Sequence, residues 1–80
     1  MFFVYIIQSL KFENQVYVGF TKDLEARIVC HNAGRSKHTS KYRPWKLLMS
    51  MNFANEKKAM AFEKYLKTQS GRAFARKRLW

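Results

Sequence analysis

The sequence predicts an α/β fold of the α+β kind, in which a three-stranded antiparallel or mixed sheet is flanked by helices. Apolar residues alternate with a period of two in the short segments 2–9, 16–20 and 45–53, as they do in strands. Apolar residues recur at helical spacing at about 23–32 and 55–68. The expected order is strand, strand, helix, strand, helix, followed by a short C-terminal helix.

The chain is expected to form one domain, residues 1–80, because so short a chain buries only roughly 60% of its unfolded surface and cannot divide into two cores. Seven Phe and an apolar content of 48% are sufficient for a core without disulfides or structural metal. Cys30 is the single cysteine, and no zinc-ligand spacing is present. The apolar start lacks a basic leader and is too short to span a bilayer. We therefore expect a cytoplasmic protein.

The first two strands are expected to pair as an antiparallel hairpin. Segment 2–9 carries β-branched and aromatic residues on both faces, which is typical of a strand in the middle of a sheet. A polar connection at 11–14 leads to the second strand at 16–20. This pairing would bring Tyr5 and Tyr17 near each other.

Capping residues predict where the first helix begins and ends. The hydroxyl of Thr21 and the acidic residues after it favour a helix that starts there and runs to about Asn32. The Asn-Ala-Gly sequence ending at Gly34 stops it, and the polar, basic segment 35–41 is expected to be a loop. Pro44 then leads into the third strand.

The last third of the chain is expected to form two helices. Asn55 is a capping residue for a helix through about Thr68. A Ser-Gly pair ending at Gly71 is expected to break this helix, and residues 72–80 are expected to form a short basic terminal helix.

The net charge favours a polyanionic partner. Sixteen Lys and Arg oppose five Asp and Glu, which leaves a formal charge of +11. An anionic membrane surface is the competing partner, but no segment combines a long apolar helical face with a basic one. We therefore expect nucleic acid, with DNA first and RNA as an alternative, and no membrane.

Glu63 stands on an otherwise apolar helical stripe with Ala59, Phe62 and Leu66. A carboxylate buried there without a partner would cost several kcal/mol, so we expect a cation beside it. The alternative is a position at the rim, where the carboxylate reaches solvent or pairs with Lys67 at i+4.

Arg27 and His31, at i and i+4, project from the same helical face and could reach one phosphate or the water beside it. The alternative is a solvated helix edge with Arg27 paired to Asp23. Tyr5 and Tyr17 are, as individual residues, ordinary strand residues. Their joint occurrence with Arg27 and His31 at this spacing predicts a site.

The order and spacing of these residues resemble the GIY-YIG endonuclease superfamily. Tyr5 lies in a Val-Tyr-Ile sequence, Tyr17 opens a Tyr-Val-Gly sequence, and Arg27 follows at the matching distance. The likeness extends over essentially the whole chain, and residues 43–47 with Gly71-Arg72 look like the small stand-alone UPF0213 or YhbQ-like group. The resemblance implies the GIY-YIG fold and a nuclease.

The resemblance also implies roles for single residues. The tyrosines would lie close to the scissile phosphate, Arg27 would bind it, and Glu63 would hold one divalent metal ion, Mg²⁺ or Mn²⁺. The position of His31 on the same helical face as Arg27, and not the resemblance, predicts that it assists at the phosphate or its water. Tyr17 would orient or deprotonate the water, although a free phenol has a pKa of about 10 and needs nearby cations to ionise.

The basic residues are expected to position nucleic acid through phosphate contacts without reading its sequence. Gly19 is expected either to bring the backbone close to a ligand or a helix, or to mark a bulge. His38 is expected to contact a phosphate or to be a solvated loop residue. The expected nucleic-acid-binding residues are Gly19, Lys37, His38, Lys41, Arg43, Lys46, Arg72 and Arg76.

The predicted function is therefore a divalent-metal-dependent DNA endonuclease of low sequence specificity, in DNA repair or recombination. Larger relatives append domains that choose the substrate, and none is expected here, so a protein partner is a candidate for targeting. Many active relatives place an asparagine near the end of the domain, but here no Asn follows Asn55. The alternative is a nucleic-acid-binding module that keeps the fold without turnover.

Overall fold

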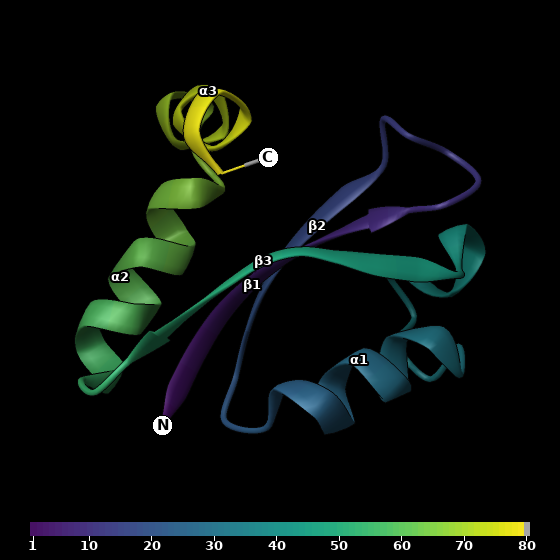
Figure 1. Cartoon of the computed structure of the whole chain (residues 1–80), viewed down its shortest axis with the longest axis horizontal. Helices are drawn as coiled ribbons and strands as arrows, with labels where there is room; N and C mark the ends of the chain where they lie inside the picture. Colours follow the sequence, from purple (N-terminus) through teal and green to yellow (C-terminus); the bar gives the residue numbers. More distant parts are fainter. Residues whose placement is uncertain (80) are drawn as a thin grey trace.

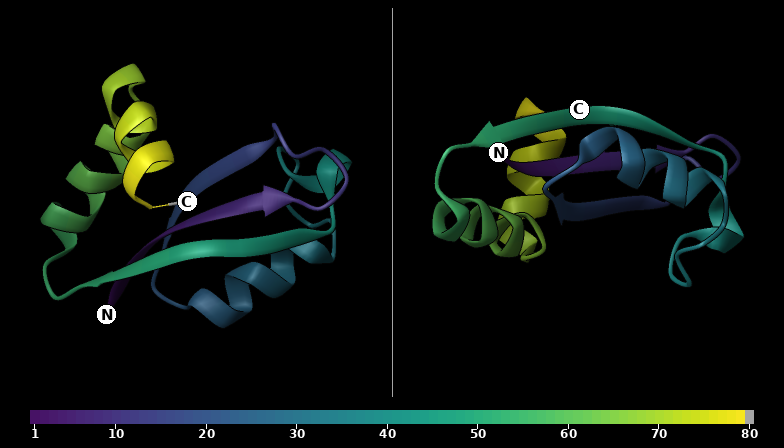
Figure 2. Two further views of the ribbon diagram at one scale, coloured as in Figure 1. Left: turned by 45° about the horizontal axis from the view of Figure 1, so that its top comes forward. Right: turned by 90° about the horizontal axis from the view of Figure 1, so that it is seen from below.

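The computed structural model describes residues 1–79 and has a three-stranded antiparallel sheet at its centre. The strands are β1 (Phe2–Ser9), β2 (Val16–Thr21) and β3 (Trp45–Phe53), and their order in the sheet is β2-β1-β3 (Figure 2). The hairpin between the first two strands and the central position of the first are both confirmed. The sheet is antiparallel throughout, which decides between the antiparallel and mixed alternatives.

Helices cover both faces of the sheet (Figure 1). Helix α1 (Leu24–Asn32) lies along one face, whereas α2 (Glu56–Leu66) and α3 (Gln69–Arg78) pack on the other. A 3-10 turn, Ser40–Tyr42, interrupts the segment before β3 that was expected to be a plain loop. Within residues 1–79, none of the helices has both the length and the apolar character needed to cross a membrane.

Strand β1 divides the core in two, because its alternate side chains point to opposite faces. Val4 and Ile6 are fully buried against α2 and α3. Tyr5 and Ile7 are fully buried on the other face, in a second cluster that α1 covers. This double covering is the reason that the first strand carries apolar residues on both faces.

The beginning of α1 differs in detail from the prediction. The side chain of Asp23, not that of Thr21, caps the helix by accepting a hydrogen bond from the Ala26 amide at 3.2 Å. Thr21 instead accepts from the Asp23 amide at 3.1 Å and orients the cap. At the other end Gly34 adopts a φ of +77°, a left-handed conformation that glycine adopts without strain.

The expected break at the Ser-Gly pair is wrong. Helix α2, capped by Asn55 as predicted, ends at Leu66, and Thr68 caps α3 by accepting from the Gly71 amide at 3.1 Å. Gly71 therefore lies in the first turn of α3. A Cβ there would collide with the carbonyl oxygen of Tyr65, so the glycine permits close approach of the two helices. Trp80, the last residue of the predicted terminal helix, lies outside the described residues.

Gly71→Ala is expected to lower the free energy of unfolding by about 1–3 kcal/mol, the usual cost of overpacking, because the atom it would meet is backbone and cannot rotate away. Urea unfolding followed by circular dichroism measures the change. Ser70→Ala, at the exposed neighbouring position, is the matched control and is expected to have little effect. Equal stability of the two variants would contradict the packing role of Gly71.

Candidate functional site

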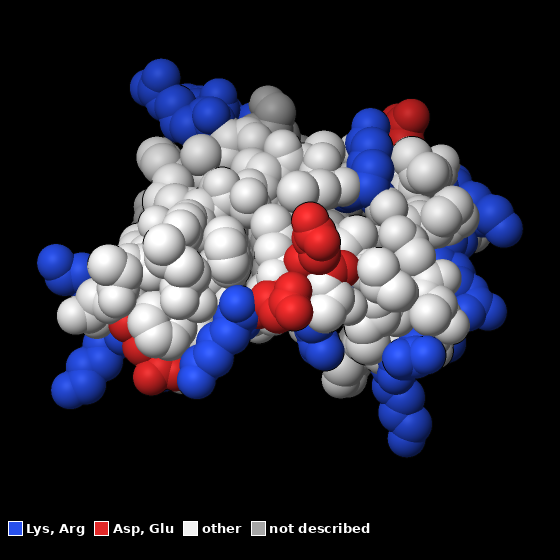
Figure 3. All heavy atoms as spheres, turned by 60° about the horizontal axis from the view of Figure 1, so that its bottom comes forward, with Lys and Arg blue, Asp and Glu red and all other residues white. Residues whose placement is uncertain are grey.

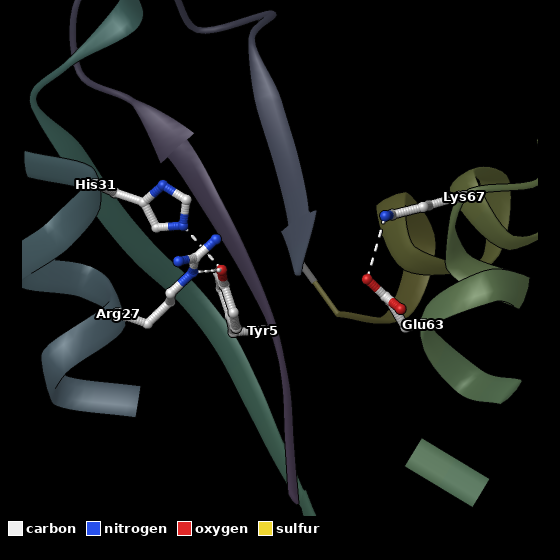
Figure 4. A network of polar contacts seen from close by, with 5 residues as sticks. All are labelled: Tyr5, Arg27, His31, Glu63 and Lys67. Carbon is white, nitrogen blue, oxygen red and sulfur yellow. Dashed lines mark hydrogen bonds and ion pairs between the residues drawn. The ribbon is translucent and has the colours of Figure 1, made fainter. Parts of the chain in front are cut away.

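The hydroxyl of Tyr5 is the centre of a group of polar contacts between β1 and α1 (Figure 4). It lies 2.8 Å from Nε2 of His31 and accepts a hydrogen bond from Nε of Arg27 at 3.4 Å. Arg27 and His31 lie one helical turn apart, so both side chains meet the sheet at the same place. The structure therefore joins three of the five predicted catalytic residues directly.

Thr39 extends this group on the far side of His31. Its hydroxyl lies 2.7 Å from Nδ1 of His31, and both residues are fully buried. The carbonyl of Thr39 accepts a hydrogen bond from the indole of Trp45 at 2.9 Å. The loop before β3 thus fixes the orientation of the imidazole.

Burial determines the protonation of this group. Burial raises the pKa of Tyr5, although the hydrogen bond from Arg27 opposes the rise. Burial and the positive charge of Arg27 lower the pKa of His31. At neutral pH both side chains are therefore uncharged, and the guanidinium carries the positive charge.

A neutral imidazole can satisfy all three contacts. Arg27 donates to the Tyr5 oxygen, and His31 either accepts from the Tyr5 hydroxyl at Nε2 and donates from Nδ1–H to Thr39, or donates from Nε2–H to Tyr5 and accepts from the Thr39 hydroxyl at Nδ1. A neutral imidazole provides the one donor and one acceptor that this chain requires. Among residues 1–79, no buried side-chain nitrogen or oxygen lacks a hydrogen-bond partner.

The expectation that His31 reaches a phosphate directly is not supported by this geometry. Both ring nitrogens are engaged within the protein, and the side chain has no exposed surface. Tyr5 is equally buried. These two residues can act on a ligand only through Arg27 and Tyr17.

Tyr17 lies between the buried group and solvent. Its ring meets the His31 ring edge-on, with centroids 5.2 Å apart, and the Tyr5 ring at 6.4 Å. The predicted proximity of the two tyrosines is therefore confirmed. Tyr17 is partly exposed, so of the two phenols it is the one that can meet a ligand or water.

Gly19 pairs with Tyr5 across the hairpin, and the Tyr5 ring lies over it. A Cβ at Gly19 would collide with that ring. The residue that approaches the backbone here is thus a tyrosine of the same chain, which gives Gly19 a packing role. Contact of Gly19 with nucleic acid stays a prediction.

Glu63 has Lys67 as its cation. Nζ of Lys67 lies 3.1 Å from Oε2 of Glu63, and the carboxylate side chain is 20% exposed. This is the arrangement that the rim alternative anticipated. The negative charge of Glu63 also contributes to the raised pKa of Tyr5, so the carboxylate lies within electrostatic reach of the buried group.

Lys67 connects the two halves of the site, which lie on either side of β2 in Figure 4. Its Nζ is 6.0 Å from the centre of the Tyr17 ring. Contacts therefore run without a gap from Arg27 through Tyr5, His31 and Tyr17 to Lys67 and Glu63. All five predicted catalytic residues belong to one constellation around the edge strand.

The ligands available at Glu63 are those of a divalent ion that binds mainly oxygen and keeps several water molecules. No group of three or more His, Cys, Asp or Glu that could hold a metal exists among residues 1–79. A closed protein cage of the zinc type is therefore not present in this part of the chain. One partly exposed carboxylate fits Mg²⁺ or Mn²⁺, whose remaining ligands would be water and phosphate oxygens.

A groove of about 440 Å³ adjoins this constellation between β2 and the C-terminal helices. Ile6, Val18 and Leu66 contribute apolar lining. Tyr17, Lys67, Arg72 and Arg76 contribute polar and basic lining. The structure thus brings two predicted phosphate-binding arginines next to the candidate site.

The other predicted phosphate-binding residues lie elsewhere. Lys37, His38, Lys41, Arg43 and Lys46 are exposed in and after the loop that holds Thr39. On the face drawn in Figure 3, basic side chains project mainly around the outline, and acidic side chains lie both at the middle and at the outline. The positive charge is therefore not gathered on that face.

The sequence did not predict a role for Thr39, and it predicted Lys67 only as an ion-pair partner of Glu63. Thr39 occurs in a polar loop, eight residues beyond the histidine that it orients, and no local pattern links the two. Lys67 had a signal in its i+4 spacing from Glu63. Its contact with Tyr17 depends on how α2 packs against β2.

Comparison with known proteins places the chain among a group of small relatives. The sequence model of the GIY-YIG catalytic domain matches residues 1–78. A UPF0213 protein of Lactococcus lactis subsp. cremoris is 41% identical over 66 residues, which cover 81% of this chain and 65% of that relative. A UPF0213 protein of Staphylococcus haemolyticus is 39% identical over 69 residues, covering 85% of this chain and 82% of the relative.

The match spans slightly less than two thirds of the Lactococcus relative.

The fold also has a counterpart among solved structures. The solution NMR structure of the UPF0213 protein BH0048 from Bacillus halodurans aligns with a TM-score of 0.58 and 26% identity. The alignment covers 96% of this chain and 84% of that chain. The predicted fold and resemblance are therefore both confirmed.

The buried His31 is expected to make folding stability fall in acid. Because its pKa is lower in the folded chain than the ordinary value near 6.5, the unfolded chain binds the proton more readily. Its contribution to stability is complete above pH ~6.5 and decreases as the pH falls toward the lowered pKa. Urea unfolding at several pH values measures this slope.

His31→Gln is expected to remove this part of the slope, whereas His38→Gln, at the exposed histidine, is the matched control and should retain it. An NMR titration of the imidazole signals of the unaltered protein gives the same information if His31→Gln does not fold. Acid sensitivity that is unchanged in a folded His31→Gln variant would contradict the assignment.

Proposed function

The chain belongs to the GIY-YIG family, and from this premise we propose that it is a DNA endonuclease of low sequence specificity. It hydrolyses phosphodiester bonds with the help of one divalent ion, Mg²⁺ or Mn²⁺, in DNA repair or recombination. A partner protein would direct it to its target. RNA is the alternative substrate.

The position of Arg27 is the observation that carries this proposal. Its Nε is bound to the buried Tyr5 hydroxyl at 3.4 Å, while the residue remains partly exposed. Among the contacts described for residues 1–79, the two terminal nitrogens of the guanidinium have no hydrogen-bond partner. A planar guanidinium fixed at one nitrogen presents the others to a phosphate, and it stabilises the negative charge that develops on the phosphate oxygens.

The buried residues act by positioning Arg27 and Tyr17. The chain of hydrogen bonds from Thr39 through His31 to Tyr5 holds the phenol oxygen that receives Arg27. Tyr17, packed on the His31 ring, is the group that orients the attacking water. Since donors fixed in advance need not reorganise during the reaction, this rigidity favours catalysis.

Glu63 is the residue that would hold the ion. When bound, a divalent ion stabilises the leaving oxygen and the charge on the phosphate. The Glu63 side chain is 20% exposed, and within residues 1–79 the one cation paired with its carboxylate is Lys67. Glu63 and Arg27 thus approach the phosphate from α2 and α1, on the two sides of β2.

The groove beside Tyr17 supplies the track for the substrate strand. Arg72 and Arg76 line it together with Lys67, so three basic residues lie where a phosphodiester chain would leave the site. The remaining exposed basic residues, Lys37, His38, Lys41, Arg43 and Lys46, would add contacts with phosphates farther away.

A binding module without turnover is the second candidate function. It is favoured by the ion pair with Lys67 that already occupies the Glu63 carboxylate. Such a module would bind DNA electrostatically and would be indifferent to Glu63 and to the ion.

Cleavage of a panel of branched, nicked, single-stranded and duplex DNA with Mg²⁺ or Mn²⁺ tests the proposed function. Arg27→Ala and Glu63→Ala are each expected to lower kcat by about 10²–10³, the effect of removing a preorganised electrostatic donor or the ion. Lys57→Ala removes an exposed charge from α2 and is the control. Wild-type activity in either site variant would contradict the assignment of Arg27 and Glu63 to a nuclease site. Binding of DNA without cleavage by the wild-type protein would favour the binding module.

Arg72→Gln is expected to weaken DNA binding to a similar degree for all sequences and to reduce the slope of log K against log salt by roughly 0.7–0.9, the value of one lost phosphate contact. Fluorescence anisotropy over a range of salt concentrations measures both. Lys57→Gln, an equal loss of charge away from the groove, should retain the slope. Equal salt slopes for the two variants would contradict the binding of DNA along this groove.

A further inference from the structure

We propose that Lys67 is a catalytic residue with two successive partners. In the free protein it pairs with Glu63. In the complex with DNA it releases the carboxylate to the divalent ion and binds an oxygen of the scissile phosphate. This inference rests on the proposed function and gives a role to a residue that the sequence presented only as the partner of Glu63.

The placement of the ammonium group is the first support. Lys67 follows the last turn of α2, and its Nζ lies 3.1 Å from Oε2 of Glu63 and 6.0 Å from the centre of the Tyr17 ring. It therefore lies between the carboxylate that would hold the ion and the phenol that would orient the water. A phosphate that contacts the ion at Glu63 and the water at Tyr17 would have its oxygens close to the ammonium group of Lys67.

The exposure of the pair is the second support. The Lys67 side chain is 50% exposed and that of Glu63 only 20%. An ion pair in which one partner is so exposed to water is weak, because solvent and salt screen it. The lysine, on a flexible four-carbon stem, is therefore the partner that moves away when a divalent ion competes for the carboxylate.

The groove is the third support, because it indicates where the released ammonium goes. Lys67 lines it together with Tyr17, Arg72 and Arg76. A phosphodiester chain in this groove has phosphate oxygens among these cations. Lys67 is the cation nearest to both Tyr17 and Glu63 in the described contacts, so its point charge is the one placed to offset the charge that develops on the phosphate.

A purely structural role makes a different prediction. If the pair only joined two positions of one helix at i and i+4, removing Lys67 would change the helix stability slightly and nothing else. Exchange of partners requires instead that ion affinity and cleavage change in opposite directions. This opposition separates the two interpretations.

The experiment compares Lys67→Met, Lys67→Arg and the control Lys64→Met, which removes one exposed charge from the same helix. Binding of Mn²⁺ without DNA is measured by paramagnetic broadening of NMR signals around Glu63, and cleavage is measured separately. Lys67→Met is expected to bind Mn²⁺ severalfold more tightly and to cleave about 10²-fold more slowly. Lys67→Arg should recover part of the cleavage, and Lys64→Met should change both quantities less.

Lys67→Met with wild-type Mn²⁺ affinity or wild-type cleavage would overturn the inference, and the NMR spectrum of each variant establishes that it is folded. A wild-type protein that cleaves and binds Mn²⁺ at Glu63 supports the proposed function whatever Lys67→Met does. A wild-type protein that does neither contradicts the proposed function, and the role of Lys67 is then rejected with it.

Discussion

The covering of β1 on both faces is the constraint on which the rest of the structure depends. It buries Tyr5 completely, and the phenol oxygen must therefore find partners inside the protein, because an unsatisfied buried hydroxyl is costly. Arg27 and His31 provide them, and Thr39 satisfies the second nitrogen of the imidazole. The orientation of α1 and the loop before β3 are thus joined to the central strand by one chain of hydrogen bonds.

The edge strand β2 turns this buried group into a site. Gly19 leaves room for the Tyr5 ring, and Tyr17, two residues earlier, carries the contact outward to solvent. Because β2 has a neighbour on only one side, Lys67 can approach Tyr17 from the helices on the opposite face of the sheet. Residues from the helices on both faces of the sheet therefore meet at this edge. A central strand would keep such residues apart.

The sequence predicts those features that depend on local spacing. Alternation placed β1 in the middle of the sheet and brought Tyr5 next to Tyr17, and the capping role of Asn55 follows from its own side chain. The contact of His31 with Thr39 depends on the path of a loop, and the place of Gly71 depends on the angle between two helices. Neither leaves a periodic signal, so both had to come from the structure.

The charged and the uncharged residues of the constellation have different roles. His31 is neutral because burial and Arg27 both oppose its protonation, so the positive charge of the centre resides on Arg27 and Lys67, at the partly exposed ends of the constellation. Glu63 supplies a negative charge beside Lys67, and the ammonium group of Lys67 lies between this carboxylate and the Tyr17 ring. An excess of positive charge at the surface attracts a phosphate, while the uncharged interior holds Arg27 in place. Loss of the interior contacts would therefore affect the proposed catalysis by changing the orientation of the Arg27 guanidinium more than by changing its charge.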